Sequence, residues 1–175
     1  MKTTAYLLLL TLFFFFASCS KTKWSDVTVN NKYAIQLPSY LEPGNFTKDA
    51  SLQYQNSAKE FYLIMIDEDK AQFVKYGLEY DLATYFKVAS AKYDTAGLVT
   101  PTLLKLGSDS ARTADFKGDI NGNEVLFKIV AIETKTNFYK LIIWMMARDK
   151  DSNAPDVDRI IHSFHELSNR LIINK

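Results

Sequence analysis

Short stretches in which apolar and polar residues alternate with a period of two recur along the chain and predict β-strands. Two of them, 27–29 and 33–37, flank Asn30-Asn31, a pair that tolerates positive φ. They predict a β-hairpin, and Pro38 is expected to end its second strand because proline cannot donate to a sheet.

A second hairpin is predicted further along, after a loop over 39–49. Alternation returns at 51–55, Asn56-Ser57 can turn the chain, and the segment 61–66 that follows is apolar without alternation. An unbroken apolar strand is typical of a central strand covered on both faces. Helices are therefore expected on at least one side of the sheet.

Two middle helices are predicted from capping residues followed by apolar positions at helical spacing. Asp67 is expected to cap a helix running to Gly77. Asp81 is expected to cap a second helix that includes Tyr93 and stops at Gly97.

The segment 100–147 reads as an antiparallel meander. Strands are expected over 111–117, 124–133 and 139–147, and Asn121-Gly122 is the strongest hairpin signal in the chain. The pattern as a whole predicts an α+β fold, an antiparallel sheet flanked by helices, in one domain over 27–175.

The last helix has the clearest pattern. Asn153 and Asp156 resemble a capping pair and Pro155 would fall in the first turn. Its apolar stripe consists of Val157, Ile160, Ile161, Phe164 and Leu167. The apolar tail 171–173 could extend this helix or form a short edge strand.

The N-terminal segment has the three regions of a secretory signal. Lys2 is followed by an apolar run over 6–16 and by the small residues Ala17-Ser18. The run is too short for a bilayer core of about 30 Å, so residues 1–18 are expected to be removed. An ordinary signal peptide in which Cys19 lies at this place by chance is the alternative.

Residues 16–19, Phe-Ala-Ser-Cys, resemble the lipobox of bacterial lipoproteins. That resemblance implies that Cys19 becomes the first residue of the mature chain and is acylated. Two or more acyl chains anchor a protein stably, so 19–26 would be a lipidated tether. Ser20 is not the aspartate that signals inner-membrane retention in that family, which implies the outer membrane, facing the periplasm.

Composition limits the remaining possibilities. Cys19 is the only cysteine among 175 residues, so an acylated chain would have no thiol for a disulfide or a thiolate metal site. Without residues 1–18, 157 residues remain, with 20 basic and 20 acidic side chains. Such a balance predicts no long-range field that favours nucleic acid or anionic lipid, so the acyl chains would have to do the anchoring.

The order of elements, with a first hairpin that ends in Leu37-Pro38, resembles the PsbP fold of photosystem PsbP proteins, Mog-type Ran-binding proteins and DcrB-type lipoproteins. The resemblance covers about 27–167. It implies a PsbP-like sandwich and a non-catalytic module that binds a protein partner. No binding residue can be carried over, because partners differ within this fold.

Candidate chemistry is sparse, and neither an enzyme nor a cofactor is predicted. His162 and His165, with Asp158 and Glu166 nearby, could chelate a metal, but a solvated helix face explains them as well. The oxygen-bearing stretch 149–153 lacks the second half of a calcium loop. No serine lies on a glycine-flanked elbow with a histidine available.

Aromatic residues concentrate in the two middle helices, where core packing explains most of them. Tyr76 and Tyr80 lie beside the break at Gly77 and are the candidates for a partner-binding surface. We therefore expect a membrane-tethered envelope lipoprotein that binds an envelope protein. The alternatives are a small-ligand carrier or a hydrolase whose site has no motif, and a chaperone-like lipoprotein that shields an apolar segment.

Overall fold

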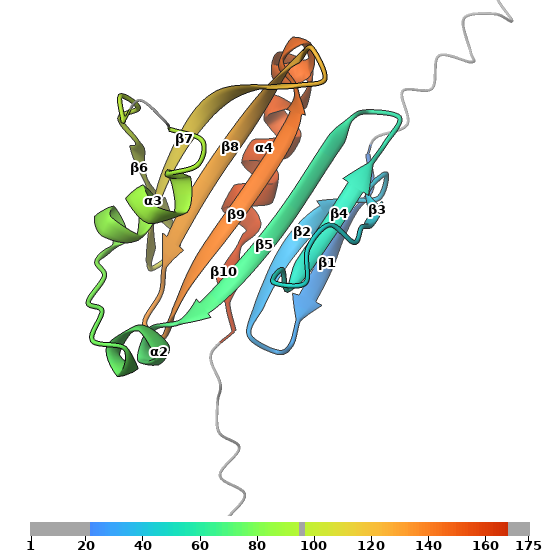
Figure 1. Cartoon of the computed structure of the whole chain (residues 1–175). Helices are drawn as coiled ribbons and strands as arrows, with labels where there is room; N and C mark the ends of the chain where they lie inside the picture. Colours follow the sequence, from blue (N-terminus) through green and yellow to red (C-terminus); the bar gives the residue numbers. More distant parts are fainter. Residues whose placement is uncertain (1–21, 95–96, 168–175) are drawn as a thin grey trace, which may run out of the picture.

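The computed structural model describes residues 22–94 and 97–167 and has two antiparallel sheets (Figure 1). The smaller sheet has the strand order β1-β2-β10, and the larger has the order β3-β4-β5-β9-β8-β7-β6. The strands are β1 (Trp24–Val29), β2 (Tyr33–Pro38), β3 (Glu42–Pro43), β4 (Leu52–Asn56), β5 (Phe61–Asp69), β6 (Thr102–Leu106), β7 (Asp109–Ile120), β8 (Asn123–Glu133), β9 (Asn137–Met146) and β10 (His165–Glu166). The helices are α2 (Lys70–Lys75), α3 (Leu82–Ser90), the 3-10 turn η1 (Ala147–Asp149) and α4 (Lys150–Ser163).

The first hairpin forms as predicted. Asn30 and Asn31 have φ values of 50° and 55°, and the Lys32 amide donates to the Val29 carbonyl at 2.8 Å. Positive φ at both central residues is the geometry of a type I′ turn, which matches the twist of the strands. β2 ends at Pro38, as expected. Because β1 already begins at Trp24, the tether predicted over 19–26 overlaps the first strand.

The larger sheet contains the predicted meander with longer strands and one strand more. β6 was not predicted and forms a hairpin with β7 across Gly107, whose φ is +62°. A second unpredicted strand, β3, lies in the expected loop and pairs with β4. β5 lies between β4 and β9 and carries the unbroken apolar run.

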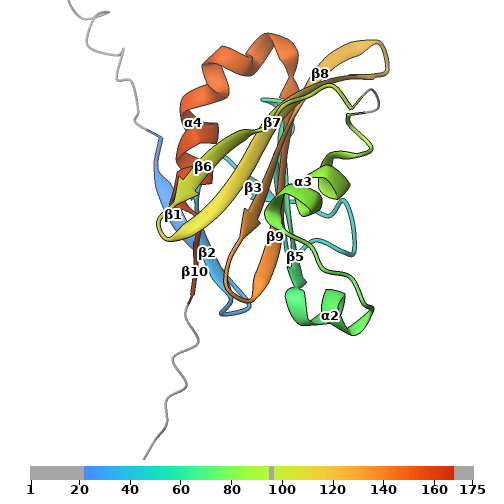
Figure 2. The same cartoon turned by 90° about the vertical axis from the view of Figure 1, so that its left-hand side faces the viewer.

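Both faces of the larger sheet are covered, as the apolar run of β5 predicts. Figure 2 shows α4 and the smaller sheet on one side and α2 and α3 on the other. The side facing α4 and the smaller sheet contains the first core, and the side facing α2 and α3 contains the second. Alternation along β9 directs Leu141 and Ile143 to the first core and Phe138 and Ile142 to the second. Two apolar layers thus share one sheet, which is how a chain of this length buries enough surface to fold without disulfides.

Of the two helix caps predicted for the middle helices, the structure has one and lacks the other. Asp81 caps α3, with its Oδ1 accepting from the Thr84 amide at 2.7 Å. Asp67 is not a cap, because β5 continues past it and Asp69 caps α2 instead. The prediction that the second helix runs to Gly97 is wrong, since α3 ends at Ser90.

The last helix begins before its predicted cap. α4 starts at Lys150, directly after η1, so that Asn153 and Pro155 lie inside it. Asn153 is buried and its side-chain amide contacts the Met145 sulfur, and this contact with the sheet replaces the expected capping role. The predicted stripe is buried at Val157, Ile160 and Ile161.

Several predicted features lie outside the described residues: the signal 1–18, Cys19 and the tail 171–173. None of the helices in the described part of the chain is long and apolar enough to span a bilayer.

Candidate functional site: an aromatic groove on the sheet

A groove of about 690 Å³ lies on the face of the larger sheet that carries α2 and α3. α3 contacts mainly β7 and β8 and only partly covers β9 and β5. The uncovered part is bounded by α3 on one side and by the loop 44–51 on the other. β5, β8 and β9 supply its floor.

Aromatic rings form one wall and part of the floor, and the ring of Tyr62, beside the residues that line the groove, stacks on that of Trp144. The rings of Tyr62 and Trp144 are parallel to within 11°, with centroids 5.3 Å apart. Phe46 meets both edge-on, at 5.4 Å from Trp144 and 5.9 Å from Tyr62. Phe127 extends the aromatic surface and packs on Tyr93 at 4.9 Å. Rings in such arrangements attract one another, which keeps the surface in one shape.

The loop that carries Phe46 is held in place by one side chain of β4. Gln53 Oε1 accepts from the Phe46 and Thr47 amides at 2.5 and 2.9 Å, and Gln53 Nε2 donates to the Thr47 carbonyl at 2.8 Å. The wall of the groove is therefore fixed before any ligand arrives. A preformed surface loses less conformational entropy on binding.

The rim of the groove exposes apolar side chains. Phe46 is 41% exposed, Val88 55% and Ile120 44%, and all three line the same groove. Isolated exposed apolar residues need no explanation, but a contiguous apolar patch marks an interaction site.

Positive charge accompanies this apolar surface. Lys140 projects from β9 into the groove, half-buried, and forms no ion pair with any described residue. Lys92 lies over the Tyr93 ring at 4.7 Å. Asp49 is the one acidic side chain among the residues that line the described groove. The groove thus suits a ligand that is largely apolar and carries at least one negative group.

Sequence reasoning missed this site, although its residues carried a signal. Lys140, Ile142 and Trp144 alternate with Leu141 and Ile143 along β9, so the period of two in the predicted strand 139–147 places them on one face. The sequence could not show how far α3 extends over that face. A half-exposed tryptophan in a central strand, next to an unpaired lysine, is the signal that points to the groove.

The two tyrosines predicted to bind a partner lie near α2, outside the groove. Tyr76 is 73% exposed and has the exposed residues Val74 and Leu78 beside it. Tyr80 is half-buried, with its ring 5.0 Å from Phe73 at the edge of the second core. Tyr76 therefore belongs to a second group of exposed apolar residues, the patch beside α2, while Tyr80 packs mainly against the core.

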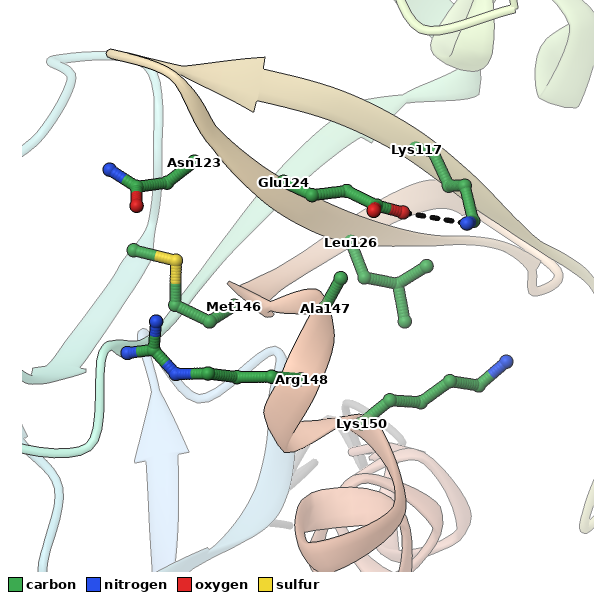
Figure 3. A pocket seen from close by; sticks show the side chains of 8 residues that line it. All are labelled: Lys117, Asn123, Glu124, Leu126, Met146, Ala147, Arg148 and Lys150. Atoms are coloured by element: carbon green, nitrogen blue, oxygen red, sulfur yellow. Dashed lines mark ion pairs between the residues drawn. The ribbon is translucent and has the colours of Figure 1, made fainter.

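A polar pocket of about 500 Å³ lies where the β7–β8 hairpin meets the start of α4 (Figure 3). Its cations are paired: Lys117 with Glu124 at 2.6 Å, Arg148 with Glu60 at 2.5 Å, and Lys150 with Asp115 at 3.1 Å. A pocket whose cations are already neutralised offers little to an anionic ligand.

Asp115 in particular serves as an internal counterion. Burial raises the pKa of its carboxyl, but Lys128 at 2.5 Å and Lys150 together outweigh that effect and lower the pKa. The carboxylate stays ionised, so it holds β8 and α4 to β7 and is no general acid.

Four buried or partly buried tyrosines also have perturbed pKa values. Burial first, and then neighbouring carboxylates, raise the pKa of Tyr33, Tyr40, Tyr85 and Tyr139 far above the usual value of a phenol. Their hydroxyls remain protonated. Three of them donate to carboxylates: Tyr85 to Glu68 at 2.5 Å, Tyr40 to Asp156 at 2.6 Å and Tyr139 to Glu166 at 3.0 Å, while the Tyr33 hydroxyl shares a hydrogen bond with that of Ser51 at 2.9 Å. They hold elements together and activate no nucleophile.

The candidate metal ligands are not brought together. His162 lies in the last turn of α4 and is exposed, whereas His165 lies in β10, so the prediction that both are on one helix is wrong. His165 Nδ1 is 3.1 Å from the Ser163 carbonyl oxygen. Within the described ranges, no three histidine, cysteine or acidic residues cluster as a metal site would require.

Comparisons with known proteins agree with this architecture. No protein-family model matches the chain, and no curated protein matches it in sequence. Among solved structures, it is similar to LpqN of Mycobacterium tuberculosis, a protein involved in cell envelope biogenesis, with 12% identity and a TM-score of 0.55 over 85% of this chain and 92% of that one. It is also similar to the cyanobacterial PsbP of Synechocystis, with 10% identity and a TM-score of 0.53 over 86% and 96% of the two chains.

A variant of Mog1 matches with 10% identity and a TM-score of 0.52, over 84% of this chain and 97% of that one. A Bacteroides thetaiotaomicron protein matches with 10% identity and a TM-score of 0.53 over 77% of this chain, which spans only 44% of that protein. Identities this low establish a shared fold alone. The α+β domain is PsbP-like, as the order of elements predicted.

Proposed function

We propose that this chain is a membrane-tethered envelope lipoprotein whose single domain is a non-catalytic module that binds a protein partner in the aromatic groove. In this proposal, residues 1–18 are removed, Cys19 is acylated and the domain faces the periplasm from the outer membrane. The fold shared with LpqN, an envelope protein, is consistent with that location.

One observation carries the binding proposal: a preformed aromatic surface with three exposed apolar residues on its rim. Interfaces are enriched in aromatic side chains, and their strongest contacts centre on tryptophan, tyrosine and arginine. The groove lies open along the sheet, so a small ligand would keep much of its surface in water. A segment of a partner protein would cover the open groove with the rest of the partner, so that both the segment and the groove would be buried.

Site-specific photo-crosslinking in intact cells tests this proposal. A photoreactive amino acid replaces Val88 on the groove rim or, as a matched control, Leu103 on the edge strand β6, which is 66% exposed. We expect one discrete adduct from position 88 and none from position 103. The same adducts from both positions would contradict a binding site in the groove.

A third arm places the photoreactive group at Tyr76. An adduct there, and none at position 88, would transfer the binding role to the patch beside α2. The chaperone-like alternative also uses an open apolar groove and differs in the number of partners. It predicts many adducts of different mass from position 88, whereas a dedicated module predicts one.

A further inference from the structure

The end of the domain that follows the tether carries two aromatic rings with cations over them, and these rings, Trp24 and Tyr40, are only partly buried at the edge of the core that contains α4. Arg159, on α4, lies over the Trp24 ring with its guanidinium carbon 4.2 Å from the ring centroid. Beside it, Lys59 lies over the Tyr40 ring at 4.1 Å. Lys23 is exposed, and its carbonyl accepts from the Ser39 amide at 2.8 Å, which fixes the first residues of the strand.

The charges of these cations are available to a partner. Arg159 donates to the neutral side chain of Gln36 at 3.1 Å, and none of Lys23, Lys59 or Arg159 forms an ion pair with a residue in the described ranges. Two carboxylates lie nearby, but their hydrogen bonds come from neutral groups: Asp156 accepts from the Tyr40 hydroxyl at 2.6 Å and Asp26 from the Gln36 amide at 3.1 Å. Cations that lie against aromatic rings and lack a counterion suit an anionic surface.

Chain length determines what that surface can be, if Cys19 is acylated as proposed above. An extended chain advances at most about 3.6 Å per residue, so five steps keep Trp24 within about 18 Å of Cys19. The end of the domain that carries Trp24 therefore stays within about 18 Å of the acylated cysteine, close to the lipid headgroups. Tryptophan and tyrosine are enriched at membrane interfaces, and arginine and lysine are attracted to anionic lipids.

We infer that Trp24, Tyr40, Lys23, Lys59 and Arg159 form a contact with phospholipid headgroups that holds the domain upright on its membrane. The inference rests on the proposed lipidation. It has a structural consequence, because α2 and the start of β1 lie at opposite ends of the molecule in both views (Figures 1 and 2). The patch with Tyr76 would point away from the membrane, and the groove would stay open on the side.

The chain offers a matched pair of fluorescent reporters for this orientation, because it has two tryptophans, Trp24 and Trp144. The lipidated Trp144→Phe protein retains only Trp24, and the lipidated Trp24→Phe protein retains only Trp144. Each is placed in phosphatidylethanolamine and phosphatidylglycerol vesicles, with or without bromine on the acyl chains. Bromine quenches only nearby indoles. We expect brominated lipid to quench the emission of Trp24 and to leave that of Trp144 unchanged.

Charge removal provides the second measurement. Arg159→Gln should weaken the quenching of Trp24, whereas Lys75→Gln, which removes an exposed charge from α2 at the other end, should not. If the protein floats with the vesicles but bromine changes the emission of neither tryptophan, the contact would be overturned and the tether would remain. Protein that does not float would overturn the tether and, with it, the contact.

Discussion

Glu166 lies at the junction between the two sheets and accepts hydrogen bonds from three hydroxyl groups. Its Oε1 accepts from the hydroxyls of Thr134 at 2.7 Å, Thr136 at 3.2 Å and Tyr139 at 3.0 Å. β10, which contains Glu166, belongs to the smaller sheet, while Tyr139 lies in β9 of the larger one. One carboxylate therefore ties three hydroxyls across the molecule.

Glu166→Ala should destabilise the protein, because it leaves the hydroxyl of the fully buried Tyr139 without its acceptor. Loss of a partner by a buried polar group costs about 1–3 kcal/mol. For a domain of this size, that lowers Tm by roughly 3–10 °C in thermal unfolding followed by circular dichroism. Glu42→Ala removes an exposed carboxylate and serves as the control. Equal melting of the two variants would show that the network contributes nothing.

Single residues were predicted well where only their neighbours in sequence determine the outcome. Asn30-Asn31 and Asp81 act within one turn of chain, and both have the predicted role. Asp67 and Asn153 have the composition of caps, but tertiary contacts use them otherwise. Asp67 pairs with Lys32 across the sheets, and Asn153 turns inward to Met145.

At the scale of elements, the ion pair between Lys32 and Asp67 connects the first hairpin to β5. The two atoms lie 2.5 Å apart, and the Asp67 side chain is only 11% exposed. Burial raises the pKa of Asp67, but hydrogen bonds from Lys32 and Ser51 together outweigh it and hold the pKa below the usual value. A carboxyl with a lowered pKa stabilises the fold above its usual pKa, and the contribution is lost as pH falls through the lowered one.

Lys32→Gln should therefore lower the free energy of unfolding at neutral pH by about 0.5–1 kcal/mol, since half of the lysine is exposed. The difference from wild type should shrink as the pH falls below about 3.9, where Asp67 begins to protonate in the unfolded chain. Urea titrations at several pH values measure both effects. Lys48→Gln, at an exposed position, is the control, and a gap that does not change with pH would contradict the pairing.

Most elements follow from periodicity, and the exceptions have physical reasons. The meander and the last helix were predicted because their apolar patterns are long. β6 was missed because it is a short edge strand in which Leu103 is exposed, so its pattern shows no buried face. Lys140 and Trp144 in one strand were a signal for a site on β9, but the extent of the groove could not be predicted. The groove exists only where α3 leaves the sheet uncovered, and that depends on packing between elements distant in sequence.

The whole molecule, as we propose it, consists of three parts in order from the membrane: an acylated cysteine, a tether of a few residues, and a PsbP-like domain with a lateral groove. The fold is shared with LpqN, a protein involved in cell envelope biogenesis, and with a cyanobacterial PsbP, at identities of 10–12%. The fold comparisons do not bear on the groove and the unpaired cations, which are described from the residues of this chain. Everything proposed about location rests on the first part.

The mass and N-terminal residue of the protein isolated from its native membranes test that claim most directly. We expect a mature chain that begins at Cys19 and carries acyl groups, and Cys19→Ala should abolish the incorporation of labelled fatty acid. A mature chain that begins at another residue, or an unmodified Cys19 at its start, would contradict the account.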